Sequence, residues 1–376
     1  MGENTVNILH IDTEKEWRGG QQQVAYLLQG LIDRKIVTSL VCQPSSKLVD
    51  FCRAENIPFH PVRMRGELDV LAAFKIANIA RRNKFNILHL HSAHALSIGL
   101  LTKLFYSIPK LIGVRRVDFH IKNHIFSNWK YNNHLLDRIV CISEGIKNVL
   151  IEDGVPPEKI AMIRSGIDIN KFSNKSGGYN IRERFKIPDN HILIGTVAAV
   201  VGHKDYPTLL QAASLVIQKV PEVTFLAAGE GNDADSIRNL ARQLQLGERF
   251  IFAGFQPDVG SFLKSFDIFV MASKTEGLGT SILDAQSVGL PVIATQTGGI
   301  PEIVRHNQNG LLVPPQDQAA LADAIIELIN DESRRNRMSN NAKENVKKFS
   351  IVQTIENTIR LYEELLNGQD EPVKNI

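Results

Sequence analysis

The stretch DIFVMASKTEGLGTSILDAQSVGLPVIAT, residues 267–295, contains a buried strand, a glycine-rich turn, a helix and a second strand. The first strand ends near Ser273, Gly277 and Gly279 break the pattern, and the helix starts near Thr280. Glycines let the backbone approach a ligand closely, and the free N–H groups at the start of a helix attract an anion such as a diphosphate. The stretch therefore predicts a parallel βα unit with a ligand-binding turn.

The same alternation of short apolar runs and amphipathic helices extends over the whole chain, and it is the pattern of βα units around parallel sheets. It occurs in two series, separated by a polar, turn-rich segment at residues 170–190. The predicted strands of the first series are VNILHID, IVTSLVC, PFHPVRM, NILHLHS, KLIGVRR, RIVCIS and KIAMIRS, and those of the second are ILIGTVAAV, VTFLAAG, RFIFAGF, DIFVMAS, PVIATQ and GLLVPP.

The two series predict an α/β protein with two Rossmann-like, doubly wound parallel-sheet domains that face a central cleft. A chain of 376 residues is long enough for two cores. We expect an N-terminal domain at residues 1–172 and a second domain at 173–350. Residues 351–376 are expected to form a C-terminal helix that packs back on the N-terminal domain and ends in a frayed tail.

Composition and cysteine usage favour a cytoplasmic protein. Apolar residues make up 43% of the chain, as in ordinary globular proteins. The three cysteines, Cys42, Cys52 and Cys141, are scattered and odd in number, which suits a reducing compartment. The first residues do not read as a secretory signal, and the longest apolar run, residues 192–201, is too short to span a membrane.

Charge is distributed unevenly. The net charge is +3, but residues 1–172 carry roughly 23 Lys and Arg against roughly 16 Asp and Glu. A basic half can meet an anionic lipid surface, a phosphorylated acceptor or nucleic acid, or can simply be solvated. Peripheral contact with the inner face of an anionic membrane is one expectation, and nucleic acid is not an expected partner.

Two acids stand beside the glycine-rich turn. Glu276, at the end of its strand, can accept hydrogen bonds from the hydroxyls of a neutral group attached to a bound diphosphate. Asp284, eight residues later, can hold the two hydroxyls of a ribose. The alternatives are a solvated loop acid for Glu276 and, for Asp284, an acid favoured by the helix dipole.

The sequence EGLGTSILDAQSVGLPVIAT, followed by GGIPEIV and NGLLVPP, resembles the donor-site signature of the family four retaining glycosyltransferases, which have the GT-B fold and belong to glycosyl transferases group 1. Further matches are RGGQQQ after the first strand, RSGIDINKF before the second domain, HKDYPTLL, and GEG after VTFLAA. These motifs occur in the order of the family over nearly the whole chain.

The resemblance implies a role for each matching residue. Glu276 would contact the donor sugar, Asp284 the ribose and Lys204 the diphosphate, while the loop of Gly19 and Gly20 closes on the donor. The base would rest at the turn that ends in Phe255. The remaining donor contacts implied by the signature are Gly277, Leu278, Gly279 and Thr280.

Two positions depart from the family pattern. The second glutamate of the signature is Asp284 here, one methylene shorter, so its ribose contact is weaker or bridged by water. The arginine usually found five residues before the lysine is Ala199, which removes a charge-assisted contact worth about 1.5–3 kcal/mol. Both Glu276 and Lys204 are retained.

In the first domain, the strand KLIGVRR leads to Arg115, Arg116 and His120. Related enzymes have a histidine near this place that touches the donor sugar, and His120 is the best positional match. A neutral imidazole there can hydrogen-bond a sugar hydroxyl or handle the acceptor proton. The alternative is a surface histidine. The two arginines either face an anionic acceptor or only solvate the strand end.

Two patterns suggest a metal, and both have a simpler interpretation. His89 and His91 share one face of a strand, but no acid or cysteine of suitable spacing completes a ligand set, and His94 is better suited to the acceptor side. Asp233 and Asp235 form an Asp-x-Asp pattern directly before a helix, where aspartates act as caps. We expect neither a metal nor a cofactor.

The resemblance therefore implies a retaining glycosyltransferase that moves a sugar from a nucleotide diphosphate sugar to a hydroxyl of a glycan, glycolipid or other acceptor. Synthesis of cell-surface glycans, lipopolysaccharide or glycolipids is the expected setting. The catalytic group would comprise Glu276, Lys204 and His120. The alternatives are a GT-B epimerase or nucleotide-sugar hydrolase, and a non-catalytic sugar-nucleotide binding protein.

Overall fold

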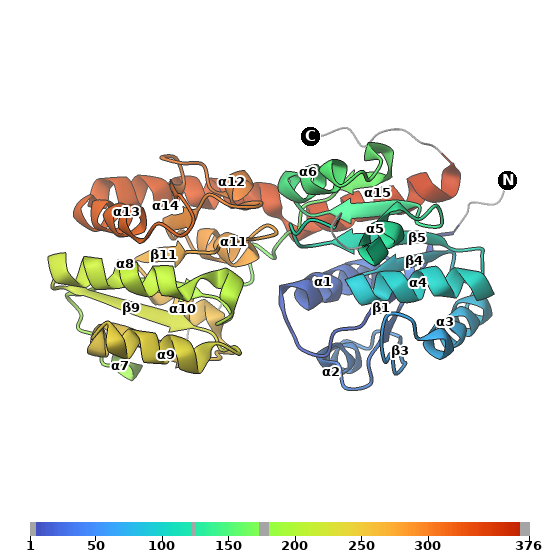
Figure 1. Cartoon of the computed structure of the whole chain (residues 1–376), viewed down its shortest axis with the longest axis horizontal. Helices are drawn as coiled ribbons and strands as arrows, with labels where there is room; N and C mark the ends of the chain where they lie inside the picture. The colour runs from blue at the N-terminus through green and yellow to red at the C-terminus, as the bar shows by residue number, and fades with distance from the viewer. Residues whose placement is uncertain (1–4, 122–124, 173–179, 369–376) are drawn as a thin grey trace. The chain divides into compact units, whose positions relative to one another are not determined.

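Short buried strands alternate with helices throughout the computed structural model, which describes residues 5–121, 125–172 and 180–368 (Figure 1). The chain divides into two units. Unit 1 contains residues 1–166 and 351–376, and unit 2 contains residues 167–350. Each unit has its own parallel sheet with helices packed against it.

The sheet of unit 1 has seven strands in the order β3-β2-β1-β4-β5-β6-β7, and neighbouring strands are parallel. Its central strands are buried along nearly their whole length, as expected for a sheet covered by helices on both faces. The strands are β1 (Asn7–Asp12), β2 (Val37–Cys42), β3 (Phe59–Pro61), β4 (Ile87–Leu90), β5 (Lys110–Arg115), β6 (Arg138–Cys141) and β7 (Ile160–Met162).

The helices of unit 1 follow these strands in turn. Several begin at a polar side chain that accepts a hydrogen bond from the first turn, such as Ser92 before α4 and Asp69 before α3. The helices are α1 (Gly19–Asp33), α2 (Lys47–Ala54), α3 (Val70–Arg82), α4 (Ala93–Phe105), α5 (Ile125–Asn132), α6 (Glu144–Glu152) and α15 (Ile351–Asn367), with a 3₁₀ turn η1 (Pro157–Lys159).

The sheet of unit 2 has six strands in the order β10-β9-β8-β11-β12-β13, and these are parallel as well. Strands β9, β11 and β12 are buried at every position. The strands are β8 (Ile192–Val197), β9 (Val223–Ala228), β10 (Phe250–Gly254), β11 (Ile268–Met271), β12 (Val292–Thr295) and β13 (Gly310–Val313).

The helices of unit 2 complete a second βα series. The α-helices are α7 (Ile181–Arg184), α8 (Tyr206–Lys219), α9 (Ala234–Gln243), α10 (Val259–Ser265), α11 (Thr280–Ser287), α12 (Ile300–Ile303), α13 (Gln318–Asn330) and α14 (Glu332–Val346), and the 3₁₀ turns are η2 (Gly202–Lys204), η3 (Gly247–Arg249) and η4 (Lys347–Phe349).

In each sheet the strand order reverses once, between β1 and β4 in unit 1 and between β8 and β11 in unit 2. Connections on the two sides of such a point run in opposite directions, which opens a crevice at the carboxyl ends of the two strands. All thirteen predicted strands are present, and the predicted pair of Rossmann-like parallel-sheet units is confirmed. The loops after β1, β4, β8 and β11 are therefore where a site is expected.

The C-terminal helix α15 is part of unit 1, although unit 2 separates it in sequence from the rest of that unit. The hydroxyl of its buried Tyr362 lies 2.6 Å from Nδ1 of His89 in β4. Its Ile355 packs against Gly30 of α1, where even a Cβ on the glycine would lie 2.3 Å from Ile355 Cδ1. The predicted frayed tail falls at residues 369–376, outside the described residues.

The division between the units falls after Gly166, whereas the sequence placed the boundary at residue 172. Two contacts give the reason. The N–H of Ile167 donates to the carbonyl of Phe349 at 2.9 Å, and Phe172 packs against Gly260 of α10. These residues therefore belong to unit 2, before the polar segment that marked the expected boundary.

The helices of the described part of the chain are too short or too polar to cross a bilayer.

Gly195, in the middle of β8, gives a test of the packing between β8 and its covering helices. A Cβ at this position would lie 2.1 Å from the ring of Phe266, which is buried. We expect Gly195→Ala to lower the free energy of unfolding by about 1–3 kcal/mol, because overpacking shifts the ring or the strand. Chemical denaturation measures this, and Gly66→Ala, with open space around its Cβ position, is the control. Equal stability of the two variants would contradict the packing.

Candidate functional site

Lys204 and Glu276 form an ion pair at the carboxyl edge of the unit 2 sheet. Lys204 follows β8 and Glu276 follows β11, the two strands between which the strand order reverses. Nζ of Lys204 contacts Oε2 of Glu276, and each side chain is 15% exposed. The hydroxyl of Ser273 donates to the same carboxylate oxygen at 3.3 Å. The structure thus brings together two residues predicted for the site that lie far apart in sequence.

Backbone contacts fix the loops that carry this pair. The N–H of Lys274 donates to the carbonyl of His203 at 2.8 Å, which ties the loop after β11 to η2. Asp205, in a left-handed conformation with φ of 49°, ends η2 and accepts a hydrogen bond from Thr208 at 2.7 Å. Its other carboxylate oxygen lies 3.4 Å from Nζ of Lys274. The position of Lys204 is therefore set by both strands of the crevice.

The predicted glycine turn leads directly into α11. Gly279 has φ of 88° and precedes Thr280, and within the described chain no side chain caps the start of this helix. The first N–H groups of α11 are therefore not paired with a capping side chain, which suits an anion. Leu278 is 1% exposed and anchors the turn in the core, so only its backbone can meet a ligand. The N–H of Gly299 donates to the carbonyl of Glu276 at 3.1 Å and supports the turn from β12.

The loops after β9 and β10 complete this edge of unit 2. Gly229 and Gly231 lie so close to the carbonyls of Ala198 and Val200 that a Cβ would be about 2 Å away, so glycine is required at both positions. Phe255, directly after β10, is 75% exposed, and it is the one large apolar side chain that is exposed in the described part of unit 2. An exposed ring at this edge can stack on a planar ligand.

Asp284 lies in the second half of α11 and is partly buried. The alternative for Asp284 is an acid favoured by the helix dipole, which acts on acids in the first turn. Asp284 lies beyond the first turn of α11, so the dipole does not explain it. Burial raises its pKa to about 6, and the charge of Lys171 opposes the shift.

In unit 1, the predicted glycines lie at the open start of α1. The helix begins at Gly19, and in the described structure no side chain caps it. Gly20 faces Arg116, whose Cδ would be 3.5 Å from a Cβ on the glycine. Burial lowers the pKa of Arg116 to about 10, and the nearby carboxylate of Asp12 opposes this shift. The start of α1 thus combines free N–H groups with a partly buried cation.

His120 is oriented by an acid that the sequence did not indicate. Its Nδ1 lies 2.8 Å from Oδ1 of Asp153, whose side chain is fully buried, while the imidazole itself is 42% exposed. Arg115 has a structural role: its guanidinium donates to the carbonyls of Val117 and Phe119 and to the hydroxyl of Tyr131. Arg115 is buried and these bonds hold the strand end, so the expectation that it only solvates that end is wrong. The imidazole of His120, in contrast, stays partly exposed.

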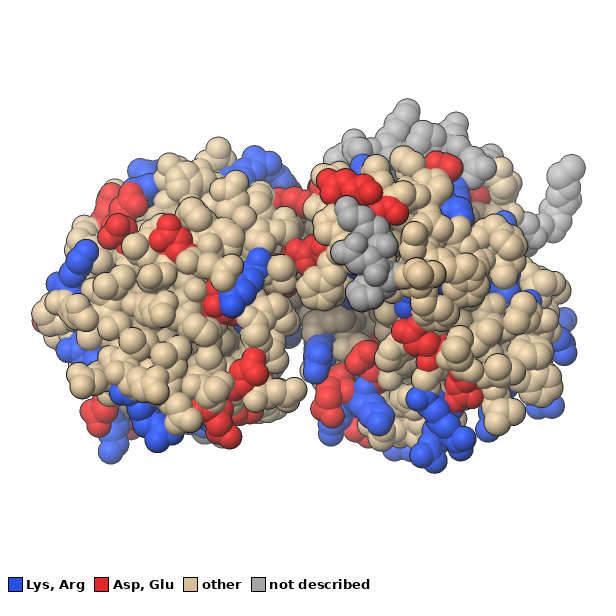
Figure 2. Space-filling model, viewed as in Figure 1, with Lys and Arg blue, Asp and Glu red and all other residues tan. Residues whose placement is uncertain are grey.

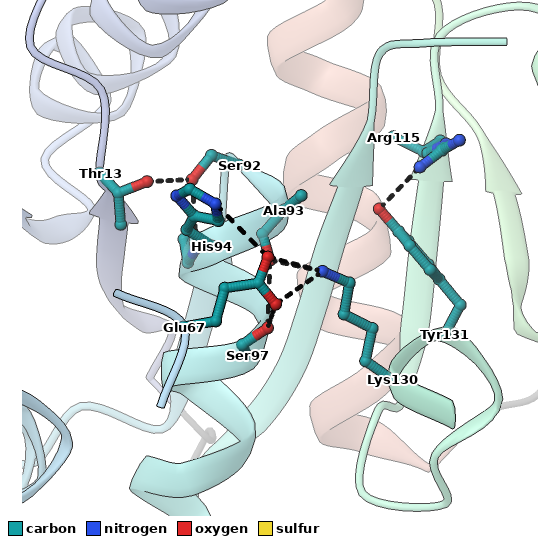
Figure 3. A network of polar contacts seen from close by, with 10 residues as sticks. Thr13, Glu67, Ser92, Ala93, His94, Ser97, Arg115, Lys130 and Tyr131 are labelled. Carbon is teal, nitrogen blue, oxygen red and sulfur yellow. Dashed lines mark hydrogen bonds and ion pairs between the residues drawn. The ribbon is translucent and has the colours of Figure 1, made fainter. Parts of the chain in front are cut away.

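A polar network surrounds Glu67, in the turn before α3 (Figure 3). Its carboxylate accepts a hydrogen bond from Ser97 of α4 at 2.8 Å and pairs with Lys130 of α5 at 3.2 Å. Nε2 of His94, at the start of α4, lies 3.4 Å from the same carboxylate, and the imidazole is 58% exposed. Figure 3 shows the imidazole and the ammonium group meeting this carboxylate from two different helices. No sequence motif marked Glu67.

Three histidines of unit 1 form a buried cluster. The sequence paired His89 with His91 and found no third partner, but β1 places His10 beside them, with Nδ1 of His10 2.8 Å from Nε2 of His91. Burial lowers the pKa of His10 to about 3 and those of the other two well below the ordinary value. The third histidine was missed because it comes from a strand far away in sequence.

A cavity of about 30 Å³ beside this cluster is lined by Arg116 and by His89 and His91. Its described lining has no carboxylate, so a divalent cation there would face the arginine without a compensating negative charge. The cavity has the volume and the polar groups for one water molecule. The expectation that the protein uses no metal stays a prediction.

The Asp-x-Asp pattern lies at the start of α9. Asp233 occupies the N-cap position, but within the described residues its side chain makes no capping hydrogen bond. Asp235 lies in the first turn and pairs with Arg238 at 3.3 Å. Stabilisation of the helix dipole accounts for both acids, whereas the expected capping bond is not formed.

The family model described as Glycosyltransferase Family 4 matches residues 17–171, and the model described as Glycosyl transferases group 1 matches residues 179–345. An uncharacterized glycosyltransferase of Methanocaldococcus jannaschii is 30% identical over 316 residues, which cover 82% of this chain and 84% of that protein.

Two further relatives match almost the whole chain. The UDP-Gal:alpha-D-GlcNAc-diphosphoundecaprenol alpha-1,3-galactosyltransferase of Escherichia coli is 24% identical over 380 residues, 95% of this chain and 96% of that one. The crystal structure of Anabaena HepE in complex with UDP and glucose has a TM-score of 0.84 at 20% identity and covers 95% of this chain and 99% of that chain. At this identity the structural likeness concerns the fold.

The raised pKa of Asp284 predicts a dependence of stability on pH. Its proton is held more tightly in the folded state than in the unfolded state, where the pKa is 3.8. The contribution of this group to the free energy of unfolding is therefore complete below about pH 4 and is lost as the pH rises through about 6. Denaturation curves at several pH values, compared between wild type and Asp284→Asn, measure the difference.

In that comparison, the asparagine variant is expected to gain stability relative to wild type as the pH rises from about 4 to about 7. Asp323→Asn, at an acid that is 76% exposed, is the control. A stability difference that stays constant over this range in the Asp284 variant would contradict the burial of a charge at this position.

Proposed function

Because the chain is a glycosyltransferase of the glycosyl transferases group 1 family, we propose that it transfers a sugar from a nucleotide diphosphate sugar to a hydroxyl of a glycan or glycolipid acceptor, with retention of the anomeric configuration. The observation that carries the donor assignment is the contact between Lys204 and Glu276 beside the open start of α11. Retention is taken from the family resemblance.

In the proposed donor complex, the ion pair opens to receive the substrate. The ammonium group of Lys204 and the first N–H groups of α11, near Thr280, bind the diphosphate. Glu276, released from the lysine, accepts hydrogen bonds from sugar hydroxyls, and Ser273 keeps its carboxylate in place. Asp284 is proposed to hold the ribose and Phe255 to stack on the base. Gly19 and Gly20 of unit 1 are proposed to close on the diphosphate.

The proposed reaction forms a bond between the acceptor oxygen and the anomeric carbon and breaks the bond between that carbon and the diphosphate oxygen. The negative charge that develops on the diphosphate is stabilised by Lys204 and the start of α11, without a metal. The acceptor proton passes to the departing phosphate, as the family resemblance implies. Glu276 stabilises the reacting sugar through its hydroxyls.

The acceptor is assigned to unit 1. His120, held by Asp153, has a partly exposed imidazole that can hydrogen-bond a sugar hydroxyl. His94, beside the carboxylate of Glu67, offers a second group of the same chemistry at the carboxyl end of β4. The Escherichia coli relative, a galactosyltransferase that acts on a diphosphoundecaprenol-linked sugar, supports an acceptor of the glycolipid class.

The alternatives are an epimerase or hydrolase of the same fold and a non-catalytic binder. An epimerase or hydrolase would consume the sugar nucleotide without an acceptor, and a binder would not consume it at all. The family membership favours neither. We further propose a cytosolic location, which the three free, buried cysteines support.

Replacing Glu276 tests the transfer reaction. We expect Glu276→Ala to lower the rate of transfer at least about a hundredfold, equivalent to some 2.7 kcal/mol in the barrier, because the contacts to the reacting sugar are lost. Product formation from the sugar nucleotide and a lipid-linked acceptor is followed by chromatography. Glu222→Ala, an exposed acid at the opposite edge of the same sheet, is the control. Near wild-type activity of the Glu276 variant would refute the assignment.

Replacing Lys204 tests the diphosphate site, and a thermal-shift panel of UDP, GDP and ADP identifies the base. The nucleotide that stabilises the wild type should stabilise Lys204→Ala much less, since a charge-assisted contact of about 1.5–3 kcal/mol is lost. Lys219→Ala, at a lysine that is 63% exposed in the same unit, should respond as the wild type does. An undiminished shift in the Lys204 variant would exclude the lysine from the diphosphate site.

A further inference from the structure

Exposed large apolar side chains are concentrated in unit 1. Among the described residues, all of them except Phe255 belong to this unit, which is also the more basic one. Scattered single residues of this kind are normal, but a group of them on adjacent helices marks a contact surface. Figure 2 shows a broad uncharged area over α4, with charged side chains toward its margin.

Helix α3 has an outward face that changes character along its length. Leu71 is 69% exposed and Phe74, one turn further on, is 49% exposed. The same face continues with Lys75 and ends at Arg82, both exposed. The opposite face is buried in the unit through its alanines and Ile76. The helix is therefore apolar outside at its start and basic outside at its end.

The end of α4 extends this face. Leu104 is 70% exposed and Ile108, just past the helix, is 68% exposed. The ring of Phe105 meets that of Phe74 edge-on at 5.5 Å, which joins the two helices at the surface. Arg81 of α3 donates to the carbonyl of Phe105 at 2.5 Å. We define the α3–α4 surface as Leu68, Leu71, Phe74, Leu104 and Ile108 with the cations Lys75, Arg81 and Arg82.

The network around Glu67 fixes the start of this surface. Leu68, which is 67% exposed, follows Glu67 directly, and the carboxylate of Glu67 is bonded to Ser97 of α4 and Lys130 of α5 (Figure 3). Asp69, next in sequence, caps α3 through the N–H of Ala72. The segment that carries Leu68 is thus held against α4 and α5 through Glu67, and it leads into a capped α3. His94, at the start of α4, lies beside Glu67.

We propose that the α3–α4 surface docks on a lipid bilayer that contains anionic lipids. Apolar side chains beside a group of cations match the interfacial region of such a bilayer, where the apolar groups enter the acyl boundary and Lys and Arg reach the headgroups. The docking would bring unit 1 to a membrane-embedded acceptor. The surface itself does not depend on the proposed donor chemistry.

Vesicle flotation with the full chain tests this proposal. Vesicles of phosphatidylcholine with about 30% phosphatidylglycerol, at roughly 50 mM salt, should bind the protein, and binding should weaken with added salt or without the anionic lipid. We expect Leu71→Ser with Phe74→Ser to lower the partition coefficient about tenfold or more, because both side chains leave the acyl boundary. Lys75→Gln with Arg82→Gln should lower it severalfold and reduce the salt dependence.

Val352→Ser is the matched control, at an apolar residue of α15 that is 49% exposed, on a helix that packs beside α1. All variants should keep the wild-type thermal unfolding and the same stabilisation by nucleotide, which separates this test from the one on the donor site. Wild type that ignores the anionic vesicles, or a serine double variant that binds them as wild type does, would overturn the proposal. A dimer in light scattering that the serine variant converts to a monomer would assign the surface to a second copy instead.

Discussion

The contact between Lys204 and Glu276 depends on how the strands and loops of unit 2 are arranged around it. Two charged groups, each mostly withdrawn from water, are stable there only because each offsets the charge of the other. Their contact requires β8 and β11 to be neighbours in the correct register, and requires both following loops to be held by backbone hydrogen bonds. A ligand that offers a diphosphate to the lysine and hydroxyls to the glutamate can replace this contact without leaving either charge buried alone.

Unit 1 holds its polar groups differently. Two of its polar side chains are positioned by buried partners from other elements: Asp153 orients His120, and Lys130 and Ser97 hold Glu67. The contacts of these partners are made within the protein. They therefore hold His120 and Glu67 in position without a bound ligand. Unit 2 keeps an open helix start and an ion pair that a ligand can separate. Two similar folds thus hold their polar groups in different ways.

Sequence alone was sufficient for the family, the GT-B fold and the thirteen strands, because each depends on local patterns: apolar runs, glycine turns and motif order. It also named Lys204 and Glu276, which the fold brings into contact. It missed His10 and Asp153, since a partner from a distant strand or helix end leaves no local pattern. The roles proposed for the individual site residues stay predictions.

Unit 1 is completed late during synthesis, because its last helix, α15, follows unit 2 in the sequence. Tyr362 and His89, whose side chains meet in the core of unit 1, are 273 positions apart in the chain. At a ribosomal rate of about 5–20 residues per second, the strands of unit 1 wait roughly 10–40 seconds for their last helix. Unit 2 is continuous in sequence and emerges entirely within that interval. The surface of unit 1 that α15 finally covers therefore stays uncovered during that interval.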